Sequence, residues 1–105
     1  MSTIESNDNN YEKLIKENKL ILFDFFGTWC SPCKALSPIL DSIASDMKDN
    51  LVIAKHDIDS SPNFPTTQNV RGVPALYLYK DQKLISQKIG MTSKEDLVTW
   101  LKEFI

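Results

Sequence analysis

Both cysteines of the chain lie in one short segment, Cys30-Ser31-Pro32-Cys33, where an apolar run gives way to a helical pattern. Two residues three apart at the start of a helix share one face, close enough for their sulfur atoms to form a disulfide. Cys30 falls at the predicted helix N-terminus, where unpaired backbone N–H groups and the helix dipole favour a thiolate. Because the thiolate attacks in disulfide exchange, the segment indicates a redox site, with Cys30 as nucleophile and Cys33 as resolving thiol.

Four neighbouring residues are expected to adjust this chemistry. Pro32 falls in the first helical turn, where its missing N–H removes no helical hydrogen bond and its fixed φ stiffens the loop. Ser31 and Pro32 lie between the cysteines and tune the stability of the thiolate, which sets the redox poise. Lys34 either favours a nearby thiolate or is simply solvated. Trp29 adds a large apolar surface beside the attacking sulfur.

A Cys-x-x-Cys pair has two other common uses. A structural zinc site usually takes four Cys or His ligands, and beyond the pair the chain has only His56, so we expect no metal. An inert structural disulfide would close too small a loop to constrain the unfolded chain much, and cytosolic proteins seldom keep one. Both interpretations explain the pair less well than a redox site does.

Length and charge restrict the class of protein. The 105 residues fit one domain, 1–105, and are enough to bury a true core. The formal charge of −2, with lysines interleaved among acids, leaves no basic surface, so we expect no nucleic-acid partner.

No targeting or membrane segment is expected. The first ten residues carry Glu5 and Asp8 but no basic residue, and the longest apolar run, 20–26, is too short to cross a bilayer. If the sequence is the full precursor, these features predict a cytoplasmic protein without membrane contact. In that reducing compartment an exposed cysteine pair indicates a working site rather than a structural one.

The run 20–26 predicts a central strand covered on both faces. By alternation Asp24 shares a face with Leu22 and Phe26. If the strand is central, the carboxyl is desolvated and its pKa is raised, which makes Asp24 a buried proton acceptor and donor near Cys33, with water as a possible relay. If the strand is at an edge, or the side chain faces a loop, Asp24 has no such role.

The remaining pattern alternates helices with strands after a loose start over residues 1–9. It predicts helices over 10–18, 32–48 and 92–105, a short helical piece at 66–70, and strands over 51–59, 75–79 and 84–89. Pro38 inside the second helix predicts a kink. Ser93 lies at capping-box spacing before the last helix, whose apolar stripe places Trp100 in the core.

His56 is a tempting acid–base candidate because it is the one histidine of the chain. Alternation along the strand 51–59 puts His56 on the face opposite Lys55. We therefore expect His56 at the surface or at a sheet edge, with no part in the chemistry.

The motif WCSPCK after the strand LILFDFF, followed downstream by RGVP, resembles the thioredoxin family over nearly the whole chain. The resemblance implies the thioredoxin fold, an α/β architecture in which helices flank both faces of a central mixed β-sheet of four to five strands. It implies that Lys55 lies close to Asp24 and moderates the shift of its pKa. It also implies a cis peptide bond before Pro74, which packs against the cysteine pair and keeps metal-ligating side chains away, although sequence alone favours trans.

The activity implied by the resemblance is thiol–disulfide oxidoreduction, with protein disulfides as substrates. The implied catalytic residues are Cys30, Cys33, Asp24, Lys55 and Pro74. An extended substrate segment would pair with the backbone before Pro74, in a shallow apolar groove. The groove residues are Trp29, Gly72, Val73, Pro74, Gly90 and Met91, although Gly90 and Met91 also fit a plain strand-to-helix turn.

Cofactor and partners follow from the same resemblance. We expect no bound cofactor, only the redox-active disulfide of Cys30 and Cys33. NADPH would serve indirectly, through a flavoprotein partner, thioredoxin reductase, because this chain has no Gly-rich nucleotide loop. The other partners would be proteins that carry disulfides, and the chain is expected to be a monomer.

Several positions depart from the commonest residues of the family. Ser31 replaces a glycine, which leaves the redox potential open, and Phe26 and Thr28 leave the reductase contacts open. Gln82 also stands where the family commonly has glycine, so the turn type is open. Two other functions are compatible with the fold: an oxidase or isomerase, against which the missing export signal argues, and a binding module that would still work with both cysteines replaced by serine.

Overall fold

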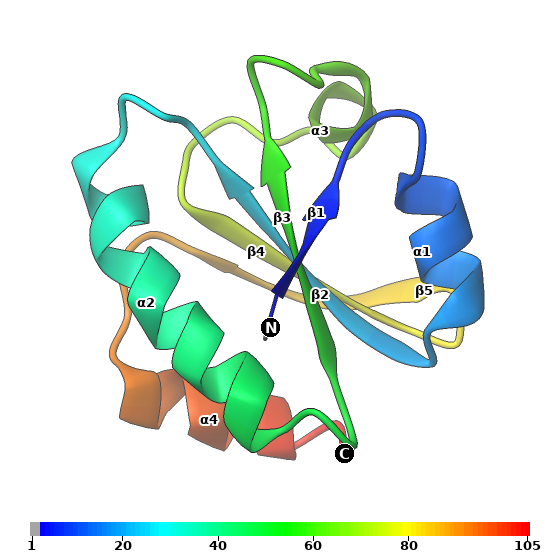
Figure 1. The fold of residues 1–105 in the computed structure, drawn as a ribbon, viewed down its shortest axis with the longest axis vertical. Coiled ribbons are helices and arrows are strands. Elements are labelled where there is room, and N and C mark those ends of the chain that lie inside the picture. The colour runs from blue at the N-terminus through cyan, green and yellow to red at the C-terminus, as the bar shows by residue number, and fades with distance from the viewer. Residues whose placement is uncertain (1–2) are drawn as a thin grey trace.

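Five strands form one mixed sheet in the computed structural model, which describes residues 3–105 (Figure 1). The strands are β1 (Thr3–Ser6), β2 (Leu20–Phe26), β3 (Val52–Asp57), β4 (Ala75–Lys80) and β5 (Lys83–Ile89). Their order across the sheet is β1-β3-β2-β4-β5, so β2 is central, as its apolar run predicts. β1 and β2 pair with β3 in parallel, whereas β4 is antiparallel to both β2 and β5.

Four helices flank this sheet on both faces, as expected. They are α1 (Tyr11–Glu17), α2 (Ser31–Asp46), α3 (Asn63–Thr67) and α4 (Lys94–Lys102). α2 and α4 cover one face, and α1 and α3 cover the other (Figure 1). Within the described part of the chain, each helix is too short or too polar to span a bilayer.

The alternation of β2 divides the core into two layers. Leu22 is fully buried among the apolar residues of α2 and α4, whereas Phe23 points to the other face, where its ring meets that of Phe64 edge-on at 5.0 Å. Burying one such side chain contributes about 2 kcal/mol to folding. Asp24 follows Phe23 and therefore points to the α2 face, as the alternation predicts.

The apolar stripe predicted for the long helix is buried in α2. Leu36, Leu40 and Ile43 are fully buried against the sheet, and the helix continues through Pro38 to Asp46. The kink at Pro38 stays a prediction. At the C-terminal end of the fold, Trp100 of α4 is buried, as its position in the stripe predicts.

The N-terminal segment is more ordered than its sequence indicates. The expected loose start is wrong for residues 3–6, which form β1, while Met1 and Ser2 lie outside the described residues. β1 pairs with β3 in parallel, with Ile4 opposite Ala54. The strand is stabilised by hydrogen bonds to β3, whose paired residues lie about 50 positions later in the chain. Local strand propensity cannot detect such a distant partner.

The short helix α3 begins earlier than predicted. Its expected range was 66–70, but the helix spans Asn63–Thr67. The Asp8 carboxylate accepts hydrogen bonds from the backbone N–H groups of Asn63 and Phe64, each at 2.9 Å. These groups would otherwise be unpaired in the first turn, so a residue distant in sequence fixes where the helix starts.

The expectation that His56 lies at the surface or at an edge is wrong, because its side chain is 0 % exposed. Its Nε2 lies 2.8 Å from the Ser61 carbonyl oxygen, and its Nδ1 lies 2.8 Å from Ser6 Oγ. A carbonyl only accepts, so Nε2 carries a proton, and in the neutral imidazole the Ser6 hydroxyl donates to Nδ1. Alternation gave the correct face, but Phe25 and Phe64 cover that face.

The turn between β4 and β5 is a two-residue hairpin loop. Asp81 and Gln82 both have positive φ, +50° and +71°, which is the type I′ geometry. Aspartate tolerates this region better than glutamine does. The open question of the turn type is therefore answered, and Gln82 is the strained residue.

Gln82→Gly should raise the free energy of unfolding by about 1 kcal/mol, because glycine adopts positive φ without a steric penalty. Chemical denaturation of the oxidised protein measures the change. Gln87→Gly, inside β5, is the control and should lower stability instead. A loss of stability from Gln82→Gly would contradict this account of the turn.

Ser6→Ala should lower the free energy of unfolding by about 1 to 2 kcal/mol, because it leaves buried His56 Nδ1 without its donor. Denaturation of the variant tests this, with Ser60→Ala at an exposed position as the control, expected within about 0.5 kcal/mol of the parent. Equal effects of the two substitutions would show that the Ser6–His56 hydrogen bond contributes nothing.

Candidate active site

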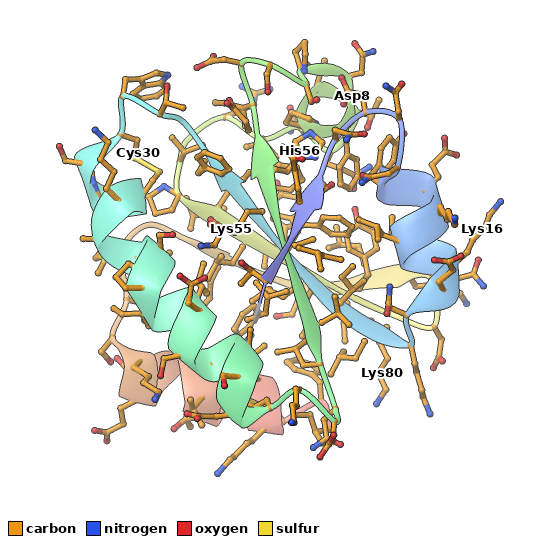
Figure 2. The ribbon with its side chains drawn as sticks, in the orientation of Figure 1. Asp8, Lys16, Cys30, Lys55, His56 and Lys80 are labelled. Atoms are coloured by element: carbon orange, nitrogen blue, oxygen red, sulfur yellow. A yellow bond between two sulfur atoms is a disulfide. The ribbon has the colours of Figure 1, made fainter. Side chains whose placement is uncertain are left out.

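The two cysteines lie at the N-terminus of α2 as predicted and are joined in a disulfide (Figure 2). Their Cα atoms are 5.3 Å apart, and both side chains are buried. Cys30 is the N-cap residue, and its sulfur accepts a hydrogen bond of 3.2 Å from the Cys33 N–H. Helix donors directed at this sulfur would stabilise negative charge on it after reduction.

A loop from the other side of the sheet closes over Cys30. The Val73–Pro74 peptide bond is cis, so the expectation from the family resemblance is confirmed. The Val73 carbonyl oxygen lies 3.9 Å from Cys30 Sγ, and Pro74 is buried. Residues 43 positions apart in sequence therefore meet at the attacking sulfur.

Gly90 joins this loop, because its N–H donates to the Pro74 carbonyl at 2.8 Å. Its φ of +93° is a conformation that side chains rarely adopt, so the strand-to-helix turn itself requires glycine here. Met91 follows with half of its side-chain surface exposed. The structure thus places Val73 beside Cys30 and joins Gly90 to Pro74, while Gly72 is exposed at the start of the loop.

Trp29 is 63 % exposed, unusually so for a tryptophan, yet its ring is fixed on two sides. Its indole N–H donates to Asp59 Oδ2 at 2.6 Å. A Cβ at Gly27 would lie 2.6 Å from the Trp29 ring, so only glycine leaves room for the indole. Sequence analysis missed both Gly27 and Asp59, because nothing in their spacing indicates a contact with the tryptophan.

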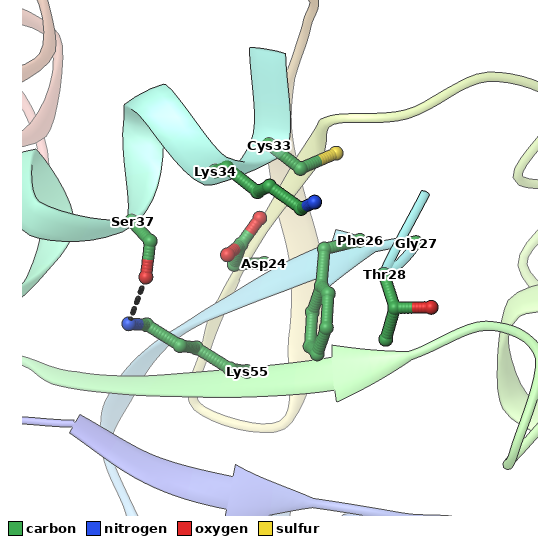
Figure 3. A pocket seen from close by; sticks show the side chains of 8 residues that line it. All are labelled: Asp24, Phe26, Gly27, Thr28, Cys33, Lys34, Ser37 and Lys55. Atoms are coloured by element: carbon green, nitrogen blue, oxygen red, sulfur yellow. Dashed lines mark hydrogen bonds between the residues drawn. The ribbon is translucent and has the colours of Figure 1, made fainter. Parts of the chain in front are cut away.

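Asp24 is buried on the central strand, as predicted, with 2 % of its surface exposed. It lines a cavity of about 270 Å³ together with Cys33 and Lys55 (Figure 3). Burial raises the pKa of the carboxyl from 3.8 to about 7, Lys55 partly opposes this rise, and Asp41 adds to it. Its Oδ1 has no hydrogen-bond partner among residues 3–105.

Lys55 lies opposite Asp24 in the register of β2 and β3, but its ammonium is bound elsewhere. It donates to Ser37 Oγ at 2.5 Å (Figure 3). It also donates to Asp41 Oδ1 at 2.8 Å, and both acceptors lie on α2. The expected proximity to Asp24 is therefore present without a direct hydrogen bond. Ser37 and Asp41 escaped sequence analysis, although their spacing of four residues places them on one helical face.

The residues expected to tune the pair occupy the first turn of α2. Ser31 and Pro32 are exposed between the cysteines, and Lys34 lines the cavity with Asp24. Residues 3–105 hold no cluster of three or more His, Cys, Asp or Glu that would bind a metal ion. The arrangement is a buried disulfide whose first sulfur lies beside a cis-proline loop, while its second cysteine lines the cavity that a buried carboxyl also lines.

Known proteins resemble this chain along almost its full length. A family model described as Thioredoxin matches residues 2–103. Thioredoxin from Acidithiobacillus ferridurans is 42 % identical over 96 residues, covering 91 % of this chain and 89 % of that protein. Thioredoxin from Buchnera aphidicola subsp. Baizongia pistaciae is 38 % identical over 103 residues, covering 97 % and 94 %.

A solved structure supports the fold independently. A mutant thioredoxin from Halobacterium salinarum matches with a TM-score of 0.91, covering 98 % of this chain and 90 % of that chain at 24 % identity. At this identity the likeness concerns the fold. The mixed five-stranded sheet with four helices is thus the predicted thioredoxin fold.

Asp24→Asn should stabilise the oxidised protein in a pH-dependent manner. With a folded pKa of about 7 and an unfolded value of 3.8, the folded state binds the proton more tightly, so stability falls as pH rises from about 4 to about 7. The neutral amide removes this loss, which amounts to about 4 kcal/mol at pH 8 and vanishes near pH 3.

Denaturation of both proteins across pH 3–8 measures this difference. Asp49→Asn, at an exposed carboxyl, is the matched control and should change stability by less than about 0.5 kcal/mol at every pH. If Asp24→Asn has the same effect at pH 3 and pH 8, Asp24 does not titrate with a raised pKa.

Proposed function

Because the chain belongs to the thioredoxin family and is a thiol–disulfide oxidoreductase, we propose that it reduces protein disulfides through Cys30 as nucleophile and Cys33 as resolving thiol. The observation that carries the proposal is the position of Cys30 as the N-cap of α2, with the Cys33 N–H already donating to its sulfur. That donor favours the thiolate that exchange requires.

The exchange runs in two steps. In the reduced protein the Cys30 thiolate attacks one sulfur of a substrate disulfide, a mixed disulfide forms, and the other substrate sulfur leaves as a thiolate that takes up a proton. Cys33 then loses its proton and attacks the Cys30 sulfur. The Cys30–Cys33 disulfide forms, and the mixed disulfide breaks with its substrate sulfur leaving as a second thiolate. Two electrons have then passed from the cysteine pair to the substrate.

Asp24 accepts the Cys33 proton in the second step. Its carboxyl lines the same cavity as Cys33, and a pKa of about 7 lets it take up and release a proton near neutral pH. Lys55 acts on Asp24 by opposing the effect of burial on the carboxyl pKa. Water in the cavity is the relay that we propose between the carboxyl and the sulfur.

Substrates bind as an extended segment beside the cis-proline loop. The backbone of Val73 pairs with that segment as an added strand, and the exposed Trp29 and Met91 supply apolar contacts. The remaining groove residues are Gly72, Pro74 and Gly90. Ser31, Pro32 and Lys34 adjust the redox potential through the stability of the Cys30 thiolate.

The reaction needs a source of electrons, for which we propose thioredoxin reductase as the partner, with NADPH as its reductant. The chain itself works without a bound cofactor, as a monomeric single domain over 1–105, in the cytoplasm. Its other partners are proteins with accessible disulfides.

Reduction of insulin disulfides in the presence of dithiothreitol tests the main proposal. We expect the protein to accelerate the reaction well above dithiothreitol alone, and Cys30→Ser to return the rate to that background, because the attacking thiolate is lost and only the resolving Cys33 remains. Cys33→Ser should accumulate the mixed disulfide, which a non-reducing gel detects. Absence of acceleration by the parent protein would overturn the proposal.

A further inference from the structure

Two acceptors on one face of α2 hold the Lys55 ammonium. Ser37 Oγ lies 2.5 Å from Nζ and Asp41 Oδ1 lies 2.8 Å from it. Asp41 Oδ1 is also 3.2 Å from the Thr3 hydroxyl that donates to it, so β1 fixes the carboxylate in turn. The lysine side chain is 21 % exposed and the Asp41 side chain 50 % exposed, so solvent screens the carboxylate side of this ion pair more than the ammonium side.

The carboxyl that this ammonium would otherwise reach lines the same cavity. Asp24, Ser37 and Lys55 all line it, and Figure 3 shows the lysine directed to the serine. Asp24 Oδ1 is buried and finds no hydrogen-bond partner within the described chain. A buried ionised carboxylate without a partner is costly, so a mobile ammonium nearby would be drawn to it.

We propose that Ser37 is a positioning residue whose hydroxyl, together with Asp41, holds the Lys55 ammonium against α2 and keeps it from pairing with Asp24. The inference deepens the proposed function, because it concerns the proton acceptor of the resolving step. Ser37 touches neither sulfur nor substrate. It acts through Lys55 alone.

Charged groups face Asp24 from two elements. Lys55 comes from β3, whereas Lys34 and Asp41 come from α2, which also supplies Cys33. The neighbour of Asp24 in β4 is the apolar Leu76. Burial is the main cause of the raised Asp24 pKa, and of the two lysines it is Lys55 that opposes this rise, so its position changes how acidic the carboxyl is.

Removal of the Ser37 hydroxyl leaves the ammonium with one acceptor fewer on α2. Lysine is a point charge on a flexible four-carbon stem, so it can turn its vacant donor toward Asp24. An ammonium in direct contact favours the ionised carboxylate. Ser37→Ala should therefore move the titration midpoint of Asp24 down by about one pH unit.

The experiment is a carboxyl NMR titration of Asp24 in the oxidised protein, read together with the pH profile of substrate release from the Cys30 mixed disulfide. For Ser37→Ala we expect both the midpoint and the acidic limb of that profile to move down together. Ser37→Thr, which keeps a hydroxyl, should retain the parent values.

Ser42→Ala is the matched control. Ser42 and Asp46 on the same helix hold Lys94 with distances of 2.7 and 2.9 Å, but this lysine comes from α4 and none of the three lines the Asp24 cavity. Removal of its hydroxyl should leave the titration unchanged. An unchanged midpoint in Ser37→Ala, or an equal shift in Ser42→Ala, would overturn the inference.

The two proposals fail separately. If the parent protein reduces insulin disulfides but Ser37→Ala titrates as the parent does, only the positioning role is lost. If the parent protein does not reduce insulin disulfides, the proposed function is lost, and the titration of Asp24 in the oxidised protein still reports whether Ser37 positions Lys55.

Discussion

The burial of one carboxyl on the central strand is the constraint on which the rest of this structure depends. Asp24 interrupts an otherwise apolar strand beneath the first turns of α2, where its ionised form is poorly solvated. The burial of apolar side chains on both faces of the sheet must offset the free-energy cost of burying this carboxyl. Such a cost is kept at functional sites, and here the carboxyl shares a cavity with a cysteine.

Two opposite electrostatic environments meet at this end of the sheet. The N-terminus of α2 favours negative charge on Cys30, whereas the apolar surroundings of Asp24 disfavour negative charge on its carboxyl. The start of α2 creates both environments. Its first turn donates a hydrogen bond to the Cys30 sulfur, and the face of the helix that packs on the sheet covers Asp24. The Cys33 N–H already donates to Cys30 in the oxidised form, so the donor is in place before reduction. Reduction therefore needs no rearrangement to supply it.

Local patterns predicted the elements that carry the chemistry, while contacts between distant segments escaped them. The apolar run of β2, the stripe of α2 and the cap of α4 each depend on residues within a few positions. The burial of His56 and the start of α3 do not depend on nearby residues. Alternation told which face His56 occupies but not that aromatic rings cover that face, and the start of α3 depends on Asp8, 55 residues earlier. The hydrogen bond from the Trp29 indole N–H to Asp59 likewise joins residues distant in sequence, so no local pattern could predict it.

The face of α2 repeats one local device in two settings. A serine and an aspartate four residues apart bind one lysine in each case, and the helical spacing that allows this is visible in the sequence. The sequence does not tell which lysine arrives. Lys94 comes from α4 to an exposed site, where an ion pair contributes little, whereas Lys55 comes from β3 to the rim of a cavity that holds a buried carboxyl. The role of such a serine–aspartate pair therefore depends on which charged group the bound lysine would otherwise contact, and only the fold determines that group.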